Sequence, residues 1–266
     1  CMKKYFLLIV LSLLMVLTAC SSENEEGANK PNNSEENSKD TKSLTESDEE
    51  LEEVDSGSPS ALEGEIENYI DGMVNWTSFE MYNDFYQNFD AENAINEEYH
   101  EEWKYVSEPL QMYVSGHNIG FSNMQFEQYA TETEAYMNEN MSEWVAVDAD
   151  SVDLSNPIDR RMSLLNVIVS SAGVVSGSDL EYVKTIDAAD MITVMNELFN
   201  AMFSISFDEE MELSAVEAII TVDGERITNL EIIANGTDAD GNSAEYDFTE
   251  RYENINGLTE IDSPVK

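Results

Sequence analysis

The sequence changes character between Ser58 and Pro59, and this boundary decides which part of the chain can fold. Ser21 to Ser58 is rich in Glu, Ser, Asn and Asp and has no aromatic residue. Such a segment cannot bury enough apolar surface to offset its conformational entropy. Residues 59–266 hold all three tryptophans and most of the Tyr, Phe and Met residues, and roughly 200 residues fit one domain. We predict a single domain at 59–266, preceded by a disordered acidic tether at 20–58.

The first nineteen residues have the parts of a secretory signal peptide. Met2-Lys3-Lys4 is basic, and the apolar run from Tyr5 to Val16 is too short to span a bilayer by itself. An uncleaved anchor helix is the alternative. The end of this segment, Leu17-Thr18-Ala19-Cys20, resembles the bacterial lipobox. That resemblance implies recognition of Leu17, Thr18 and Ala19 by the signal peptidase, cleavage before Cys20, and a membrane anchor of acyl chains on the Cys20 thiol.

The charge excludes some classes of partner. The chain has 56 acidic and 12 basic residues, a formal net charge of −44, and 43 of the acids against seven of the bases lie in 59–266. Nucleic acid is excluded because phosphate binding needs a basic stripe. Anionic headgroups are disfavoured too, so membrane attachment depends on the lipid at Cys20. Adaptation to salt is the favoured reason for the acidity, since salt screens self-repulsion; cation capture and plain solubility stay open.

The first half of the domain predicts one helix and then a meander of strands. Apolar residues at helical spacing predict a helix over Ala61–Met73, with Ser60 as its N-cap and Glu63 completing a capping box. Trp76 to Phe89 predicts a strand with a bulge around Tyr82–Phe85. The further predicted strands are Tyr99–Val106, Gln111–Val114, Gln125–Ala130, Glu134–Met137 and Glu143–Val147, separated by turn residues that include Ser115-Gly116.

The second half predicts two amphipathic helices and a hairpin. Asn156-Pro157 opens one helix, which ends near Gly173, and a second begins at Asp187. Asp223-Gly224 predicts a tight turn between two strands. The predicted strands of this region are Val216–Val222, Ile227–Ala234 and Glu245–Tyr252.

No motif in the chain predicts catalysis, a metal site or a cofactor. Asp238 to Asn242 resembles part of a calcium loop, but the EF-hand register would place Gly236 where a carboxylate is needed, so a turn is the better interpretation. His100 and His117 lie in no zinc-binding spacing, and no G-x-S-x-G elbow or phosphate-binding glycine loop occurs. We predict a protein that is not an enzyme and has no cofactor. An enzyme with widely separated carboxylates is the open alternative.

Methionines and one phenylalanine form the candidate ligand site. They share the apolar faces of the two predicted helices, and flexible thioethers suit surfaces that adapt to hydrophobic ligands. Core packing is the alternative for the same residues. The candidate ligand-binding residues are Met162, Met191, Met195, Phe199 and Met202.

The order of these elements resembles a known family. The stretch Glu127 to Val147, with Glu134-Ala135-Tyr136-Met137 and Trp144, precedes two helices and a terminal hairpin that runs into Asn254-Ile255-Asn256-Gly257 and Ile261-Asp262-Ser263-Pro264. This is similar to Gram-positive lipoproteins of the LolA/LppX type. The resemblance implies an α+β fold in which a curved antiparallel sheet, an open half-barrel, covers two or three amphipathic helices.

The function expected from the resemblance is binding of a lipid or other hydrophobic or cell-envelope ligand by a lipid-anchored protein on the extracytoplasmic face of the membrane. The alternative is a surface module with a filled core that binds an envelope protein or wall polymer through the outside of its sheet. No site residue is carried over from the family.

Overall fold

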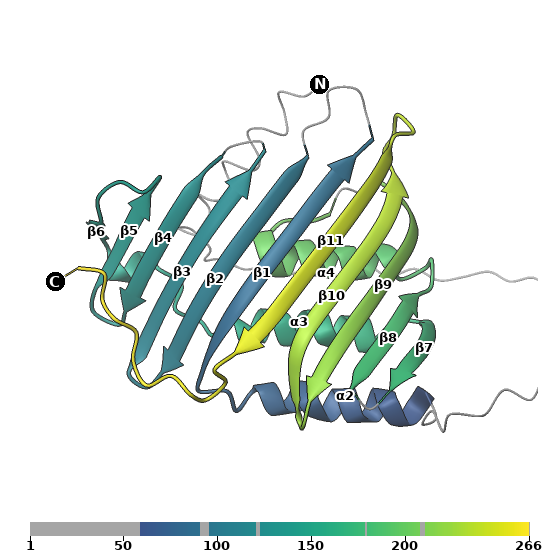
Figure 1. Ribbon diagram of the computed structural model, residues 1–266, viewed down its shortest axis with the longest axis horizontal. Helices are drawn as coiled ribbons and strands as arrows, with labels where there is room; N and C mark the ends of the chain where they lie inside the picture. Colours follow the sequence, from purple (N-terminus) through teal and green to yellow (C-terminus); the bar gives the residue numbers. More distant parts are fainter. Residues whose placement is uncertain (1–58, 91–95, 121–122, 179, 208–210, 266) are drawn as a thin grey trace, which may run out of the picture.

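The computed structural model describes residues 59–90, 96–120, 123–178, 180–207 and 211–265 (Figure 1). The predicted signal peptide, Cys20 and the predicted tether lie outside the described residues. The described residues form an open antiparallel sheet with three helices on one of its faces (Figure 1). The predicted α+β class and the open sheet over helices are confirmed.

Eleven strands make up the sheet, in the order β6-β5-β4-β3-β2-β1-β11-β10-β9-β8-β7. Two antiparallel meanders are therefore joined where the first strand pairs with the last. The strands are β1 (Ser78–Phe89), β2 (Glu97–Ser107), β3 (Leu110–Ile119), β4 (Gln125–Thr131), β5 (Ala135–Glu139), β6 (Val145–Val147), β7 (Gly173–Ser178), β8 (Glu181–Ile186), β9 (Glu212–Asp223), β10 (Arg226–Thr237) and β11 (Ser243–Glu253).

Three helices lie behind the sheet in the view of Figure 1: α2 (Pro59–Met73), α3 (Ile158–Ser170) and α4 (Met191–Phe203). A short 3-10 turn, Ala149–Ser151, precedes α3. The Asn156 Oδ1 accepts a hydrogen bond of 3.1 Å from the Ile158 N–H at the start of α3, which agrees with the predicted helix start. No helix in the described part of the chain is both long and apolar enough to cross a bilayer.

The main core fills the space between the helices and the sheet. Phe79, Leu165, Met195 and Phe248 are each 0% exposed in this layer. Every second residue of the central strands points into it, as the pleat requires. The other face of the sheet is left to solvent over much of its area, and this face is here called the exposed face.

The chain after β11 crosses the lower ends of β1 to β4 on the exposed face (Figure 1). The Asn256 N–H donates to the Ser78 carbonyl at 2.7 Å, and the Ile261 N–H donates to the Gln111 Oε1 at 2.8 Å. Ile261 also packs with Val106 and Tyr129 in a second, smaller core. This segment therefore covers one corner of the exposed face.

Two predictions about the first half of the sheet are wrong. The bulge predicted around Tyr82–Phe85 is absent, because β1 keeps one register with β2 and with β11; Asn83 is a buried polar residue that continues the alternation. The predicted turn at Ser115-Gly116 lies inside β3. Glycine fits there because a Cβ would lie 2.2 Å from the far edge of the Phe126 ring of β4, which would have to shift.

Three further predictions are corrected at the helices. Ser60 lies inside α2, which begins at Pro59, so it is not the N-cap; Glu63 instead pairs with the buried Lys184 at 3.1 Å. The helix predicted from Asp187 begins at Met191. Gly173, predicted to end a helix, begins β7, and the β7–β8 hairpin was not anticipated by any sequence pattern.

Candidate functional site

The five predicted ligand-binding residues lie in or against the main core. Met195 is 0% and Met191 8% exposed. The Phe199 ring packs edge-on against Phe85 at 5.6 Å. Met162 and Met202 are half-buried, and the Met202 sulfur lies 3.3 Å from Nη2 of Arg161. Neither of the two hollows described next is lined by any of the five.

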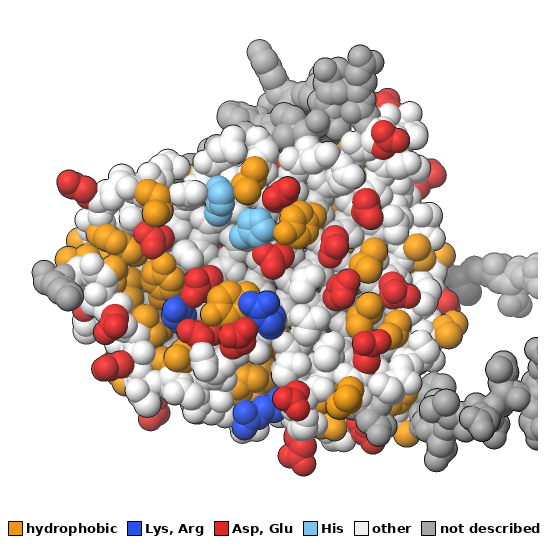
Figure 2. All heavy atoms as spheres, in the orientation of Figure 1, with side chains coloured by type: hydrophobic (Ala, Val, Ile, Leu, Met, Phe, Trp, Pro, Cys, Tyr) orange, Lys and Arg blue, Asp and Glu red, His pale blue; other side chains and the backbone are white. Residues whose placement is uncertain are grey.

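A hollow of about 520 Å³ opens on the exposed face over β1 to β4. We call it the sheet-face hollow. Figure 2 shows this face, with both histidines close together, acidic side chains spread over it and few basic ones. The lining residues are Tyr82, Asn83, Asp84, His100, Glu101, Glu102, Tyr113, Ser115, Gly116, His117, Gln125, Phe126, Glu127, Met141 and Arg251.

Strand register explains the shape of the sheet-face hollow. One row of side chains crosses five strands in the order Arg251, Tyr82, Glu102, Ser115, Glu127. Tyr113, Ser115 and His117 share one face of β3, because side chains alternate along a strand. The smallest side chain, Ser115, therefore stands between larger ones in both directions. We infer that Ser115 forms the floor of the hollow.

The histidines form one side of the sheet-face hollow. His100 and His117 are paired across β2 and β3. The His100 Nδ1 lies 2.5 Å from Oδ1 of Asp84, its cross-strand partner on β1. A carboxylate held against one ring nitrogen orients the imidazole. The sequence spacing hid this arrangement, because 16 residues separate Asp84 from His100.

Glu127 is the unusual carboxylate of the sheet-face hollow. It accepts hydrogen bonds from the Tyr113 hydroxyl at 2.8 Å and from the Asn138 amide at 2.9 Å. Both donors are neutral, and no basic side chain among the described residues pairs with Glu127. Burial, and next the bond to Glu127, raise the pKa of Tyr113 to about 12. The hollow thus holds a carboxyl group without a basic partner beside the Tyr113 ring.

The bases near the sheet-face hollow are already paired. Lys104 lies 3.1 Å from Glu102 and 3.4 Å from Glu80. Arg251 donates to Glu253 at 2.9 Å, and its guanidinium lies 4.9 Å from the centre of the Tyr82 ring. Such a distance is typical of a cation–π contact. The face therefore offers an incoming anion little positive charge.

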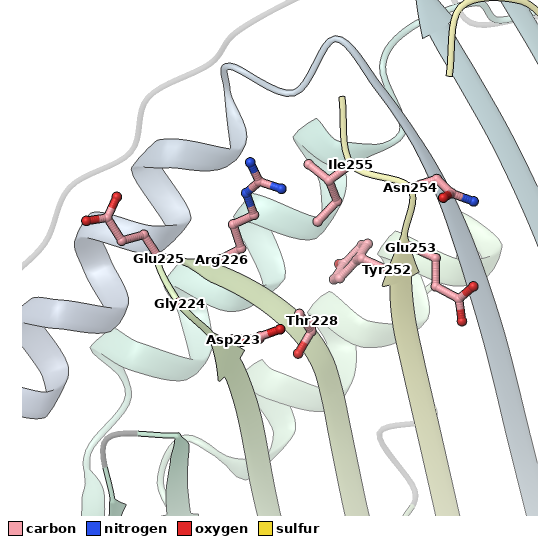
Figure 3. Close-up of a pocket in the computed structure, with 9 residues that line it drawn as sticks. All are labelled: Asp223, Gly224, Glu225, Arg226, Thr228, Tyr252, Glu253, Asn254 and Ile255. Carbon is pink, nitrogen blue, oxygen red and sulfur yellow. The ribbon is translucent and has the colours of Figure 1, made fainter. Parts of the chain in front are cut away.

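A second hollow, of about 430 Å³, lies where the β9–β10 turn meets the end of β11. Figure 3 shows the Arg226 and Ile255 side chains reaching into the space between this turn and the chain after β11. Arg226 is the one Lys or Arg in the described ranges for which no ion pair with a carboxylate is found. Asp223, Glu225 and Glu253 surround it, so this hollow has no clear preference for either sign of charge.

A polar cluster lies inside the main core, on the helix side of the sheet. The Arg161 Nε on α3 lies 2.5 Å from Glu250 on β11, and both side chains are nearly inaccessible to solvent. Burial raises the pKa of Glu250, while Arg161 opposes that rise. The Tyr252 hydroxyl donates a hydrogen bond to Glu250. This cluster attaches α3 to the centre of the sheet.

The same cluster extends onto the neighbouring strands. The Asn83 amide donates to Glu101 at 3.1 Å, and the Tyr99 hydroxyl donates to the other Glu101 oxygen at 2.8 Å. Trp103 Nε1 and Arg161 Nη1 are buried and have no hydrogen-bond partner among the described residues. This cluster could not be predicted from the sequence, since Arg161 has the spacing of an ordinary helix residue.

Metal binding finds no support in the described ranges, where no group of three His, Cys, Asp or Glu side chains is arranged around a common point. Asp238 instead closes the β10–β11 turn by accepting hydrogen bonds from the N–H groups of Asp240 and Asn242. The Asn242 side chain, then its backbone N–H, lower the pKa of Asp238.

Comparison with known proteins gives distant structural likenesses. No family model matches the sequence, and no curated protein matches it. A LolA superfamily protein from Nitrosomonas europaea has a similar structure at 9% identity, with 75% of this chain and 94% of that chain covered and a TM-score of 0.25. A DUF1329 family protein from Desulfovibrio piger is 8% identical, with 76% and 96% covered and a TM-score of 0.27.

A third similar structure is the S-type phycobiliprotein lyase of Guillardia theta, 8% identical over 71% of this chain and 95% of that chain, with a TM-score of 0.23. Structural similarities with such low identities and TM-scores do not show what this chain binds.

Proposed function

We propose that this protein is a non-enzymatic binding module of the cell envelope and that it holds its ligand on the exposed face of the sheet. The observation that carries this proposal is the sheet-face hollow of about 520 Å³, a size within the usual range for small-ligand sites. The helix side of the sheet is occupied by the main core. This arrangement favours the surface-binding alternative over a ligand held between helices and sheet.

The chemistry of the sheet-face hollow favours a cationic group, an ammonium in particular. Glu127 has two neutral hydrogen-bond donors and no basic partner among the described residues, and the Tyr113 side chain lines the same hollow. Carboxylates and aromatic rings together suit an ammonium group. An ammonium would also gain from the net charge of −44, which attracts cations over a distance.

The test is a titration of the purified protein with acetyl-Lys-Lys-Lys-amide at 0.15 M NaCl, followed by calorimetry and by NMR. The Glu127→Gln variant removes the unpaired carboxylate, and we expect it to weaken binding at least about fivefold. Glu217→Gln is the matched control, because Glu217 lies on β9, away from the sheet-face hollow.

Non-specific attraction to an acidic surface would give a different result. Both variants would then weaken binding equally, and shifts would spread over the whole exposed face. The same peptide with norleucine in place of lysine measures how much the aliphatic part of the lysine side chains contributes to binding. Equal loss in Glu127→Gln and Glu217→Gln would refute the site.

A hydrophobic ligand at Met162, Met191, Met195, Phe199 and Met202 stays a prediction. Native mass spectrometry of protein purified from its own host addresses it directly. Reproducible co-purification of a lipid, lost on Met195→Gln but kept in Glu127→Gln, would place the ligand between helices and sheet and contradict the exposed-face proposal.

Membrane attachment through Cys20 is part of the same proposal and is tested separately. The Leu17-Thr18-Ala19-Cys20 sequence supports it. Cys20→Ser should move the protein from the detergent phase to the aqueous phase in a Triton X-114 partition and abolish labelling by radioactive palmitate. An unchanged partition would show that attachment does not depend on Cys20.

A further inference from the structure

Strand β7 is the edge strand at one end of the sheet, and the backbone groups on its outer side are unpaired. The Asp187 N–H donates to the Ala172 carbonyl at 2.8 Å, which fixes the hydrogen-bonding alternation between β7 and β8. By that alternation, the N–H and C=O groups of Gly173 and Val175 point away from β8. No described residue bonds to them. The free edge therefore presents two residues ready for strand pairing.

The six side chains of β7 itself carry no charge, although Asp179 follows the strand and the Asp190 carboxylate accepts a hydrogen bond of 2.7 Å from the Ala172 N–H before it. Between Arg161 and Asp179 the sequence contains no Asp, Glu, Lys or Arg, in a chain of which 26% is charged. Val174 is 69% exposed on the same side of the sheet as Thr185, its cross-strand neighbour. Leu180, in the turn to β8, is 63% exposed. Exposed strand edges are normally protected by charged residues, because they otherwise template pairing with another chain.

The opposite edge of the sheet is protected. Strand β6 has only three residues, and the acids Glu143 and Asp148 stand close to its two ends. Short length and flanking charge are both devices that prevent edge pairing. Strand β7 is twice as long as β6, with six residues against three, so it offers more backbone for pairing.

We propose that β7 pairs antiparallel with β7 of a second copy of this protein, joining two sheets across a twofold axis. A twofold contact matches each surface with itself, and the side chains of β7 add no like-charge repulsion of their own. In the register centred on Val174, Gly173 of each copy pairs with Val175 of the other. The two exposed Val174 side chains then lie side by side on the exposed face.

The expected dimer is weak and strengthened by salt. A contact of one short strand buries less than the roughly 1,000 Å² typical of stable interfaces. Gly177 has a φ of +134°, which limits regular pairing to the first part of β7. The opposing net charges disfavour association at low ionic strength, and at 1 M NaCl the Debye length shrinks to ~3 Å. Self-association should therefore tighten as NaCl rises from 0.1 to 1 M.

Sedimentation equilibrium of the full chain carrying Cys20→Ser measures this association. We expect a monomer–dimer equilibrium at high NaCl that Val174→Glu weakens at least about tenfold. Val145→Glu is the matched control, because Val145 is a 60% exposed valine on the other edge strand. Equal weakening by both changes, or a monomer at every concentration up to about 1 mM in 1 M NaCl, would overturn the proposal.

Disulfide trapping gives a second readout that does not depend on affinity. In a background of Cys1→Ser and Cys20→Ser, Val174→Cys should form a covalent dimer under mild oxidation, because facing residues of a non-hydrogen-bonded pair have Cα atoms ~4.5 Å apart. Val145→Cys should stay monomeric. Equal trapping of both cysteines would contradict pairing through β7, and unchanged urea midpoints would confirm that both variants are folded.

Discussion

The two faces of the sheet place similar polar groups in opposite environments. Glu250, Asn83 and Glu101 form a row across β11, β1 and β2 on the helix side. Their sequence neighbours Arg251, Tyr82 and Glu102 form the adjacent row on the exposed face. Arg161 pairs with the inner row within the core, whereas in the outer row Glu102 pairs with Lys104 and Arg251 pairs with Glu253. The charged side chains on the helix side therefore contribute to the stability of the fold, whereas those on the exposed face are accessible to a ligand.

The largest effect should come from removing Arg161. The Arg161→Met variant leaves Glu250 buried without its charge partner, and loss of one member of a buried pair typically costs about 3–5 kcal/mol. Urea unfolding monitored by circular dichroism measures this loss. The double variant Arg161→Met/Glu250→Leu should recover most of the stability, since an apolar pair of similar volume is often neutral. A double variant no better than the single one would show that the cluster is needed as a whole.

A smaller effect is expected from pH. Burial raises the pKa of Glu250, Glu97 and Asp247, so the folded state binds protons more tightly than the unfolded chain does. Their contribution to the free energy of unfolding is complete below the pKa that they have in the unfolded chain. It is lost as pH rises through the pKa that they have in the folded protein. The urea midpoint should therefore rise between pH 7 and pH 5.

The control for the pH experiment is a matched pair of variants. Glu250→Gln removes a proton-binding group from the helix side, and Glu253→Gln removes one from the exposed face. We expect the urea midpoint to depend less on pH in Glu250→Gln only. A midpoint that falls steadily from pH 7 to pH 5 would contradict the sign of these pKa shifts.

Gly116→Ala should destabilise the protein by about 1 kcal/mol, the low end for an overpacked site. The added Cβ meets the far edge of the Phe126 ring at 2.2 Å, and that half-buried ring has room to swing aside. Gly72→Ala is the control, because no atom lies within 4 Å of a Cβ there. In that helix alanine should be stabilising. Thermal unfolding of both variants would reveal the difference.

The smallest effect should come from Arg251→Met on the exposed face. Arg251 is about half exposed in its pair with Glu253, and such pairs contribute about 0–1 kcal/mol. The comparison with Arg161→Met is direct, because the same substitution is made on the two faces. A loss of stability as large in Arg251→Met as in Arg161→Met would remove the distinction between the faces.

Much of the fold could be predicted from periodicity, and the site could not. Apolar and polar residues alternate along β1, β2 and β9 to β11, and Asp223-Gly224 is typical of a tight turn. Both are local patterns, so they can be recognised without knowledge of tertiary contacts. The β7–β8 hairpin was missed because four of the six residues of its first strand are Gly or Ser, which are typical of a loop.

The sheet-face hollow depends on register, which the sequence does not specify residue by residue. Tyr113, Glu127 and Asn138 meet only because β3, β4 and β5 align in one particular way, and a slip of one residue would turn each to the other face. Arg161 was missed for a related reason. A charged residue at one helix position is normally solvated, and only the packed structure places it in the core.

The pairing of β1 with β11 has a consequence for how the chain reaches its native state. Glu80 lies opposite Glu253, so the centre of the sheet joins the first strand of the domain to the last one synthesised. Contacts this far apart in sequence slow folding, because loop closure precedes the gain from pairing. The central pair of strands can therefore form only after β11 has been synthesised, and until then the two meanders of the sheet are not joined to each other.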